Sequence, residues 1–156
     1  VKAMHADREW GLRYGSGAPL AFSEEKTRET IQKALFVNRN APDNGQSWIG
    51  IVGKDGVLEG SVCLSIGSAF CSDDPILFEQ WNFVLPEYRR SDNARLLIAF
   101  STAMSCVLRL PLVLGVMSHV RTEAKCRLYQ RSLGRPLGAV FLFNGDHDEA
   151  SDLAGT

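Results

Sequence analysis

The pattern of apolar and polar positions divides the chain into helices and strands in mixed order. Apolar residues spaced three and four apart predict amphipathic helices, and alternating or continuous apolar runs predict strands. An Asp-Gly turn between two strand-like runs is typical of a β-hairpin. Helices are expected over 23–40, 93–109 and 123–133, and strands over 47–52, 57–66, 76–85, 111–117 and 137–143. Before them, residues 1–4 are expected to be the tail of a short strand, and Asp7 is expected to cap a short helix through Trp10 and Leu12.

This order of elements favours an α/β (α+β) fold. Strands joined by short turns pair antiparallel, whereas a strand, a helix and a further strand make a parallel crossover. We therefore expect a mixed, mostly antiparallel central sheet flanked by helices. A single domain is expected over 1–145, and the polar stretch 146–156 is expected to be a mobile tail.

Composition narrows the classes of function. The 156 residues are 45% hydrophobic and 22% charged, and the net charge of −1 gives no reason to expect a nucleic-acid partner. The apolar run 108–117 is interrupted by Arg109 and Pro111 and is shorter than the roughly 18 to 20 residues of a membrane span. The four cysteines are widely spaced, so we expect no metal site and a reducing, cytoplasmic setting.

The stretch from Ile76 to Leu110 carries the strongest indication of chemistry. A predicted strand leads through Pro86 into a basic loop, 89–94, and then into a long helix. The first N–H groups of a helix lack partners within the helix, and the helix dipole is positive at that end. The loop is therefore predicted to bind the pyrophosphate of a nucleotide-containing cofactor.

The same stretch resembles the GCN5-related N-acetyltransferase (GNAT) family, in the form of a divergent or phage-like member. Residues 84–89, Val-Leu-Pro-Glu-Tyr-Arg, match the family's Val-x-Pro-x-Tyr-Arg, and residues 89–94 match its Arg/Gln-x-x-Gly-x-Gly/Ala loop. The resemblance implies a splayed central strand and an acetyl-CoA-dependent transfer of an acetyl group to a primary amine. It also implies the residues that contact acetyl-CoA: Phe83, Val84 and Leu85 through their backbone, and Arg89, Arg90, Ser91, Asp92, Asn93, Ala94, Arg95 and Thr122.

Asp92 stands where the family has glycine, and two arrangements are open for it. Asp92 or Ser91 is the N-cap of the long helix, with the Asp92 carboxylate turned onto backbone N–H groups. Alternatively, the carboxylate points outward and its charge is offset by Arg89, Arg90 and Arg95. The first arrangement would compete with a phosphate for the same donors.

The late helix carries the second part of the resemblance. Thr122 is expected to cap this helix, and Gly134 to end it. The resemblance makes Tyr129 the general acid that protonates the departing thiolate; the alternative is a buried structural tyrosine.

The base that takes the proton from the amine is less defined. By resemblance to a strand glutamate of the family, Glu79 is a candidate. Strict alternation places it on one face of the strand with Leu77, Trp81 and Phe83. The opposite face would then carry Phe78, Gln80, Asn82 and Val84. Apolar neighbours would raise the pKa of its carboxyl group. A solvated Glu79, His119 as the base, or water as the relay are the alternatives.

The acceptor is expected to be a small molecule or a protein that bears an amine. By resemblance its site lies beside three segments, 10–14, 40–48 and 67–75, whose aromatic and acidic side chains suit a cation. These side chains are Trp10, Tyr14, Trp48, Phe70, Asp73 and Asp74. A degenerate member that binds without catalysis and a plain structural protein are the competing hypotheses, and a homodimer would cover an exposed sheet edge.

Overall fold

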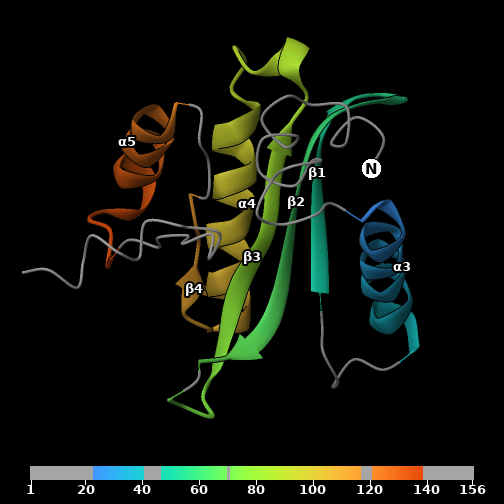
Figure 1. Cartoon of the computed structure of the whole chain (residues 1–156), viewed down its shortest axis with the longest axis vertical. Helices are drawn as coiled ribbons and strands as arrows, with labels where there is room; N and C mark the ends of the chain where they lie inside the picture. The colour runs from blue at the N-terminus through green and yellow to red at the C-terminus, as the bar shows by residue number, and fades with distance from the viewer. Residues whose placement is uncertain (1–22, 41–46, 70, 117–120, 139–156) are drawn as a thin grey trace, which may run out of the picture.

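The computed structural model describes residues 23–40, 47–69, 71–116 and 121–138. The helices and strands of this part of the chain follow the predicted order (Figure 1). They are α3 (Glu24–Asn40), β1 (Ser47–Lys54), β2 (Val57–Ser68), β3 (Pro75–Val84), the 3-10 helix η1 (Pro86–Tyr88), α4 (Asn93–Leu108), β4 (Leu112–Val113) and α5 (Thr122–Leu133).

The strands form one four-stranded sheet in the order β1-β2-β3-β4. β1, β2 and β3 pair antiparallel, and β4 joins β3 in parallel. The prediction of a mixed, mostly antiparallel sheet flanked by helices is thereby confirmed. β4 is much shorter than the predicted strand 111–117, and Leu137 and Gly138 are not in a strand. The predicted elements before residue 23, the rest of the strand 137–143 and the tail lie outside the described residues.

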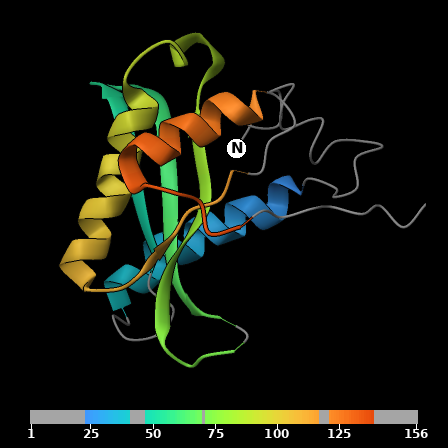
Figure 2. The ribbon, with the colours of Figure 1, turned by 90° about the vertical axis from the view of Figure 1, so that its left-hand side faces the viewer.

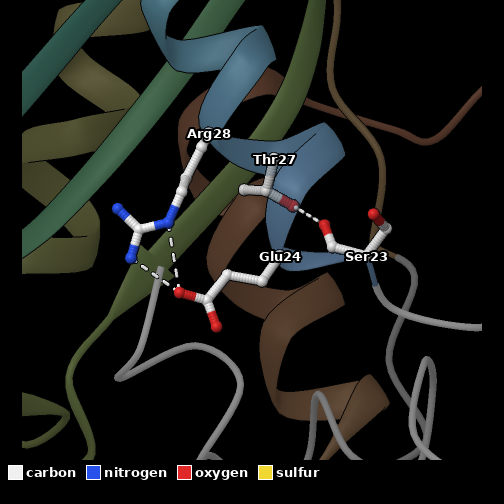
Figure 3. A network of polar contacts seen from close by, with 4 residues as sticks. All are labelled: Ser23, Glu24, Thr27 and Arg28. Atoms are coloured by element: carbon white, nitrogen blue, oxygen red, sulfur yellow. Dashed lines mark hydrogen bonds and ion pairs between the residues drawn. The ribbon is translucent and has the colours of Figure 1, made fainter.

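α3 begins where the acidic residues after Ser23 predict it. The Ser23 hydroxyl accepts a hydrogen bond from the backbone N–H of Lys26 at 3.1 Å. The Ser23 carbonyl accepts one from the Thr27 hydroxyl at 2.8 Å (Figure 3). Glu24 in the first turn pairs with Arg28 at 2.6 Å, four residues on. The Ser23 hydroxyl thus satisfies one orphan donor of the first turn, and Glu24 and Arg28 add a favourable i,i+4 pair.

Helices cover both faces of the sheet (Figure 1). On one face the core packs against α4, and on the other face it packs against Ile31 of α3. Figure 2 shows α5 lying across the strands on the side of α4. The buried residues of the α4-side cluster are Val62, Leu64, Leu77 and Leu97, and those of the α3-side cluster are Cys63, Trp81 and Phe83.

The pairing of β2 with β3 contains a β-bulge. Leu64 pairs with Glu79, but its neighbour Cys63 pairs with Trp81. Gln80 is therefore an extra residue in β3, opposite no residue of β2.

The bulge reverses the alternation of side chains along β3. Leu77 belongs to the α4-side cluster, whereas Trp81 and Phe83 belong to the α3-side cluster. The prediction that Leu77, Glu79, Trp81 and Phe83 share one face is therefore wrong. A single inserted residue shifts the two-residue period by one, so every later side chain changes face.

β3 and β4 separate soon after they meet. They pair only where Leu77 and Phe78 lie beside Leu112 and Val113, and the Leu77 N–H donates to the Pro111 carbonyl at 2.8 Å. From Glu79 onward, β3 has no strand partner on this edge within the described part of the chain. The splayed central strand expected from the resemblance is therefore present, and its open edge faces α5.

Candidate active site

A polar cluster from β3 and α5 lies at this open edge. The Tyr129 hydroxyl donates to the Glu79 carboxylate, at 3.1 Å from one oxygen and 3.3 Å from the other. The Asn82 side-chain amide donates to the Tyr129 hydroxyl at 3.3 Å. The bulge at Gln80 makes this possible, because it places Glu79 and Asn82 on the same face of β3. The two residues predicted to be base and acid are thus in direct contact.

The surroundings of Glu79 change its acidity. Desolvation by burial raises the pKa of its carboxyl group from 4.5 to about 7, and hydrogen bonds from Tyr129, Asn82 and the Gly115 backbone N–H only partly offset this effect. The raised pKa expected for a carboxyl group among apolar neighbours is therefore found. A carboxyl group with this pKa changes its charge near neutral pH and suits a general base.

Tyr129 is a weaker acid than an ordinary phenol. Burial raises the pKa of its hydroxyl, and the nearby Glu79 carboxylate raises it further. The phenol therefore keeps its proton at neutral pH and hydrogen-bonds to Glu79 as a neutral donor.

The backbone of β3 presents alternate residues to the open edge. Leu85 faces β2, because its N–H donates to the Glu59 carbonyl at 2.9 Å. In an antiparallel pair the residues alternate in direction, so Asn82 and Val84 direct their N–H and C=O groups to the open edge. The Val84 carbonyl there accepts a hydrogen bond from the Arg89 side chain at 3.1 Å. Of the backbone groups predicted to contact a thioester arm, those of Val84 lie on the open edge.

The loop between β3 and α4 is organised by Ser91. Its hydroxyl donates to the Tyr88 carbonyl at 2.6 Å and accepts from the Asn93 N–H at 3.2 Å. The side chain thus ties η1 to the start of α4 and caps the helix from the position before its N-cap.

Asp92 occupies the N-cap position of α4 but makes no side-chain cap. Its carboxylate turns outward to Arg95, at 3.2 Å, in an exposed pair. The outward arrangement considered for Asp92 is therefore the observed one, with Arg95 as the arginine that pairs with its carboxylate. Its φ of −80° lies in a region open to any residue, so this loop conformation does not need glycine at position 92.

Anion-binding groups remain at the start of α4. The backbone N–H groups of Ala94 and Arg95 have no acceptor among the described residues, and the Arg90 side chain is exposed. Arg89 lies over the Phe83 ring, 5.9 Å from its centroid, which fixes the arginine at the end of β3.

A partly buried hydrogen bond stabilises the start of α4. Asn93 is 7% exposed, and its side-chain amide donates to the Glu59 carboxylate of β2 at 2.7 Å. Because both Glu59 and the Asn93 amide are polar groups at a partly buried place, this bond satisfies them and fixes the loop against the sheet.

α4 and α5 enclose a hollow next to this loop, with a volume of about 370 Å³. It is lined by Asp92, Arg95, Leu96, Ile98, Ala99, Thr102 and Ser132.

The predicted cap of α5 differs from the observed one. Thr122 is the first residue of α5, and the N-cap is Arg121, with φ 56°, so the prediction that Thr122 caps the helix was wrong. Gly134 ends the helix as predicted.

The other predicted site residues are not gathered here. Trp48 packs against the α4-side core cluster, and Asp73 and Asp74 are exposed. Trp10, Tyr14, Phe70 and His119 lie outside the described residues. Within the described part of the chain, no three His, Cys, Asp or Glu side chains are grouped to hold a metal ion, and no helix has the length and apolarity to cross a membrane.

Comparison with known proteins yields structural but not sequence matches. No protein-family model and no curated protein matches the chain. The aminoglycoside acetyltransferase AAC(6')-Iy, solved with the bisubstrate analogue CoA-S-monomethyl-acetylneamine, has a TM-score of 0.59 at 19% identity, over 78% of this chain and 79% of that one. Aminoglycoside antibiotic 6'-N-acetyltransferase AAC(6')-IG from Acinetobacter haemolyticus gives 0.55 at 18%, over 81% and 84%.

A third match acts on a different acceptor. It is a ribosomal-protein-alanine N-acetyltransferase from Brucella melitensis biovar Abortus 2308, with a TM-score of 0.50 at 15% identity over 74% of this chain and 93% of that one. The chain therefore has the fold of the N-acetyltransferases, as the motif resemblance implied. At these identities, the likeness establishes the fold and not the activity.

Sequence reasoning did not place Asn82 with Tyr129 and Glu79. Alternation put Asn82 on the opposite face of β3 from Glu79, and no glycine or proline marks the bulge at Gln80. The signal available was the polar pair Gln80-Asn82 in an apolar strand, which is unusual for a central strand covered on both faces.

Proposed function

We propose that this protein is an acetyl-CoA-dependent N-acetyltransferase, which moves an acetyl group to a primary amine by direct attack of the amine on the thioester. The observation that carries the proposal is the contact between Tyr129 and Glu79 at the open edge of β3. A base with a pKa near 7 and a neutral phenol meet there, in a fold shared with an aminoglycoside N-acetyltransferase solved in complex with CoA.

The loop before α4 would hold the pyrophosphate of acetyl-CoA. The Ala94 and Arg95 N–H groups and the helix dipole favour an anion there. Ser91 and Asn93 would hold the loop in shape. The Ser91 hydroxyl accepts from the Asn93 backbone N–H, and the Asn93 side chain donates to Glu59. The adjacent hollow between α4 and α5 has a volume within the range of ligand sites.

The open edge of β3 would hold the pantetheine arm as an added strand. Backbone N–H groups of Asn82 and Val84 point to this edge, where they can donate to the arm and to the thioester carbonyl. A donor held in place at a developing oxyanion stabilises the transition state. Phe83 and Leu85 face β2 instead, where the Leu85 N–H donates to the Glu59 carbonyl, and the Arg89 side chain binds the Val84 carbonyl from the loop.

Glu79 would take the proton from the attacking amine, and Tyr129 would protonate the departing thiolate. With a pKa of about 7, roughly half of the Glu79 carboxyl groups are ionised at neutral pH. The acceptor class stays broad, because the similar structures include both aminoglycoside and protein N-acetyltransferases.

Binding and turnover are tested in sequence. A thermal-shift titration with acetyl-CoA should stabilise the protein, by roughly 2.7 kcal/mol at 100 times the dissociation constant. Arg90→Gln should weaken binding, whereas Arg109→Gln, an exposed arginine at the far end of α4, is the matched control.

Turnover is then measured as free thiol released with a panel of aminoglycosides, polyamines and peptide N-termini. No stabilisation at millimolar acetyl-CoA would refute the proposal. Binding without turnover on any amine would instead support a non-catalytic binding module, which the outward-turned Asp92 carboxylate near the phosphate site favours.

A further inference from the structure

The hydrogen bonds around Tyr129 restrict what its proton can do. A phenol hydroxyl has one proton to donate. The Asn82 amide nitrogen is a donor, so Tyr129 accepts from it at 3.3 Å, and the phenol proton is directed to the Glu79 carboxylate at 3.1 Å. While Glu79 is ionised, the phenol proton is therefore not available to a thiolate.

We infer that Glu79 and Tyr129 form one proton relay, in which the proton that Glu79 takes from the amine is the proton that recharges Tyr129. This inference rests on the proposed function and assigns a single path to its two proton transfers. It makes protonation of the thiolate depend on prior attack by the amine.

The steps balance. The amine nitrogen attacks the thioester carbon, a C–N bond forms, and the excess proton on nitrogen moves to a Glu79 carboxylate oxygen. The protonated carboxyl group then donates to the Tyr129 oxygen, so the phenol can turn its own proton outward. The C–S bond breaks, the thiolate takes the phenol proton, and Tyr129 takes the proton of Glu79. The products are the amide and the free thiol, and the pair returns to a phenol beside a carboxylate.

The surroundings of the pair suit this path. Glu79 is approached by Tyr129 from α5, by Asn82 from its own strand and by the Gly115 N–H from the segment after β4, and no other charged group of the described residues shifts its pKa. The residues that pack between this face of the sheet and α4 are apolar. Asn82 is a positioning residue here, because its amide orients the phenol oxygen toward Glu79 without contacting the reacting atoms.

A double-mutant cycle distinguishes a relay from an independent acid and base. Glu79→Gln and Tyr129→Phe, which keep the side-chain shapes, should each lower kcat by ~100-fold or more, in the range of general acid–base catalysis. In a relay the double variant loses no more than the worse single variant, since either change breaks the whole path. Losses that multiply in the double variant would overturn the inference. Glu29→Gln on the exposed face of α3 controls for loss of a carboxylate.

A second measurement does not depend on turnover. The Tyr129 hydrogen bond lowers the pKa of Glu79, so Tyr129→Phe should move the titration of the Glu79 carboxyl carbon, followed by NMR in labelled protein, to higher pH. The ascending limb of kcat/KM should move in the same direction. An unchanged titration would show that the two groups are not coupled. Wild-type protein that binds acetyl-CoA but releases no thiol would refute the proposed function, whereas active wild type with multiplying losses would refute the relay alone.

Discussion

Replacing Glu79 with glutamine should change how the stability of the protein depends on pH. In the folded protein, burial raises the pKa of this carboxyl group from 4.5 to about 7. Between these two pH values the folded state binds more protons than the unfolded state, so wild-type stability falls as pH rises. The neutral glutamine does not titrate, and Glu79→Gln should lack this contribution.

The size of the effect follows from the pKa values. A rise of the pKa from 4.5 to about 7 corresponds to about 3 kcal/mol, because one pKa unit is worth about 1.4 kcal/mol. The contribution is fully present below pH 4.5 and is lost by about pH 8. The free energy of unfolding of Glu79→Gln, minus that of wild type, should therefore increase by about 3 kcal/mol from acidic to mildly alkaline pH.

Urea denaturation at half-unit steps from pH 4.5 to 8.5 measures this difference. Glu29→Gln is the matched control, because Glu29 is exposed on α3 and its replacement makes the same chemical change away from the site. A difference between Glu79→Gln and wild type that stays constant across the range would show that Glu79 titrates as it does in the unfolded chain. The burial and hydrogen bonding argued for the site would then be wrong.

Three further substitutions test the core, the strand and the loop. Leu64→Ala removes a side chain that is 0% exposed and should lower the free energy of unfolding by about 2–5 kcal/mol in urea denaturation. Gly60→Ala would place a Cβ 2.9 Å from the Phe83 carbonyl oxygen, so the strand pair must shift; we expect a loss of about 1–3 kcal/mol and lower acetyl-CoA affinity by titration. Asp92→Asn removes a negative charge beside the phosphate site and frees Arg95, so acetyl-CoA should bind several-fold tighter at low salt, and weaker binding would refute the assignment of this loop.

The parts of the fold that depend on local patterns were predictable from the sequence. The long helix after the loop was expected over 93–109 and is observed as Asn93–Leu108. The hairpin of β1 and β2 follows from the Asp-Gly turn, where Gly56 has a φ of 78° that favours glycine. These features follow from periodicity and turn chemistry, which act within a few residues.

The parts that depend on contacts between distant segments were not predictable. The sequence did not show that Asn82 reaches Tyr129, which is 47 residues away, or that β4 pairs with β3 over only two residues. The cap of α5 was misplaced because Arg121, which takes the left-handed conformation, gives no sequence signal for it. For Asp92 both arrangements were consistent with the sequence, and its partner Arg95 is three residues along the helix.

The bulge at Gln80 decides the geometry of the candidate site. Glu79 and Asn82 are three residues apart, so a regular strand would place them on opposite faces of the sheet. The extra residue brings both side chains to Tyr129 and at the same time turns Trp81 and Phe83 toward the α3-side core. The Gln80 side chain itself is held by Ser65 at 2.6 Å, and the Trp81 indole by Ser61 at 3.2 Å, which fixes the bulge on the opposite face from the site. A regular β3 that paired Gln80 with a residue of β2 would put Asn82 and Val84 on the α3 side, so the amide that orients the phenol and the backbone groups at the open edge both depend on the bulge.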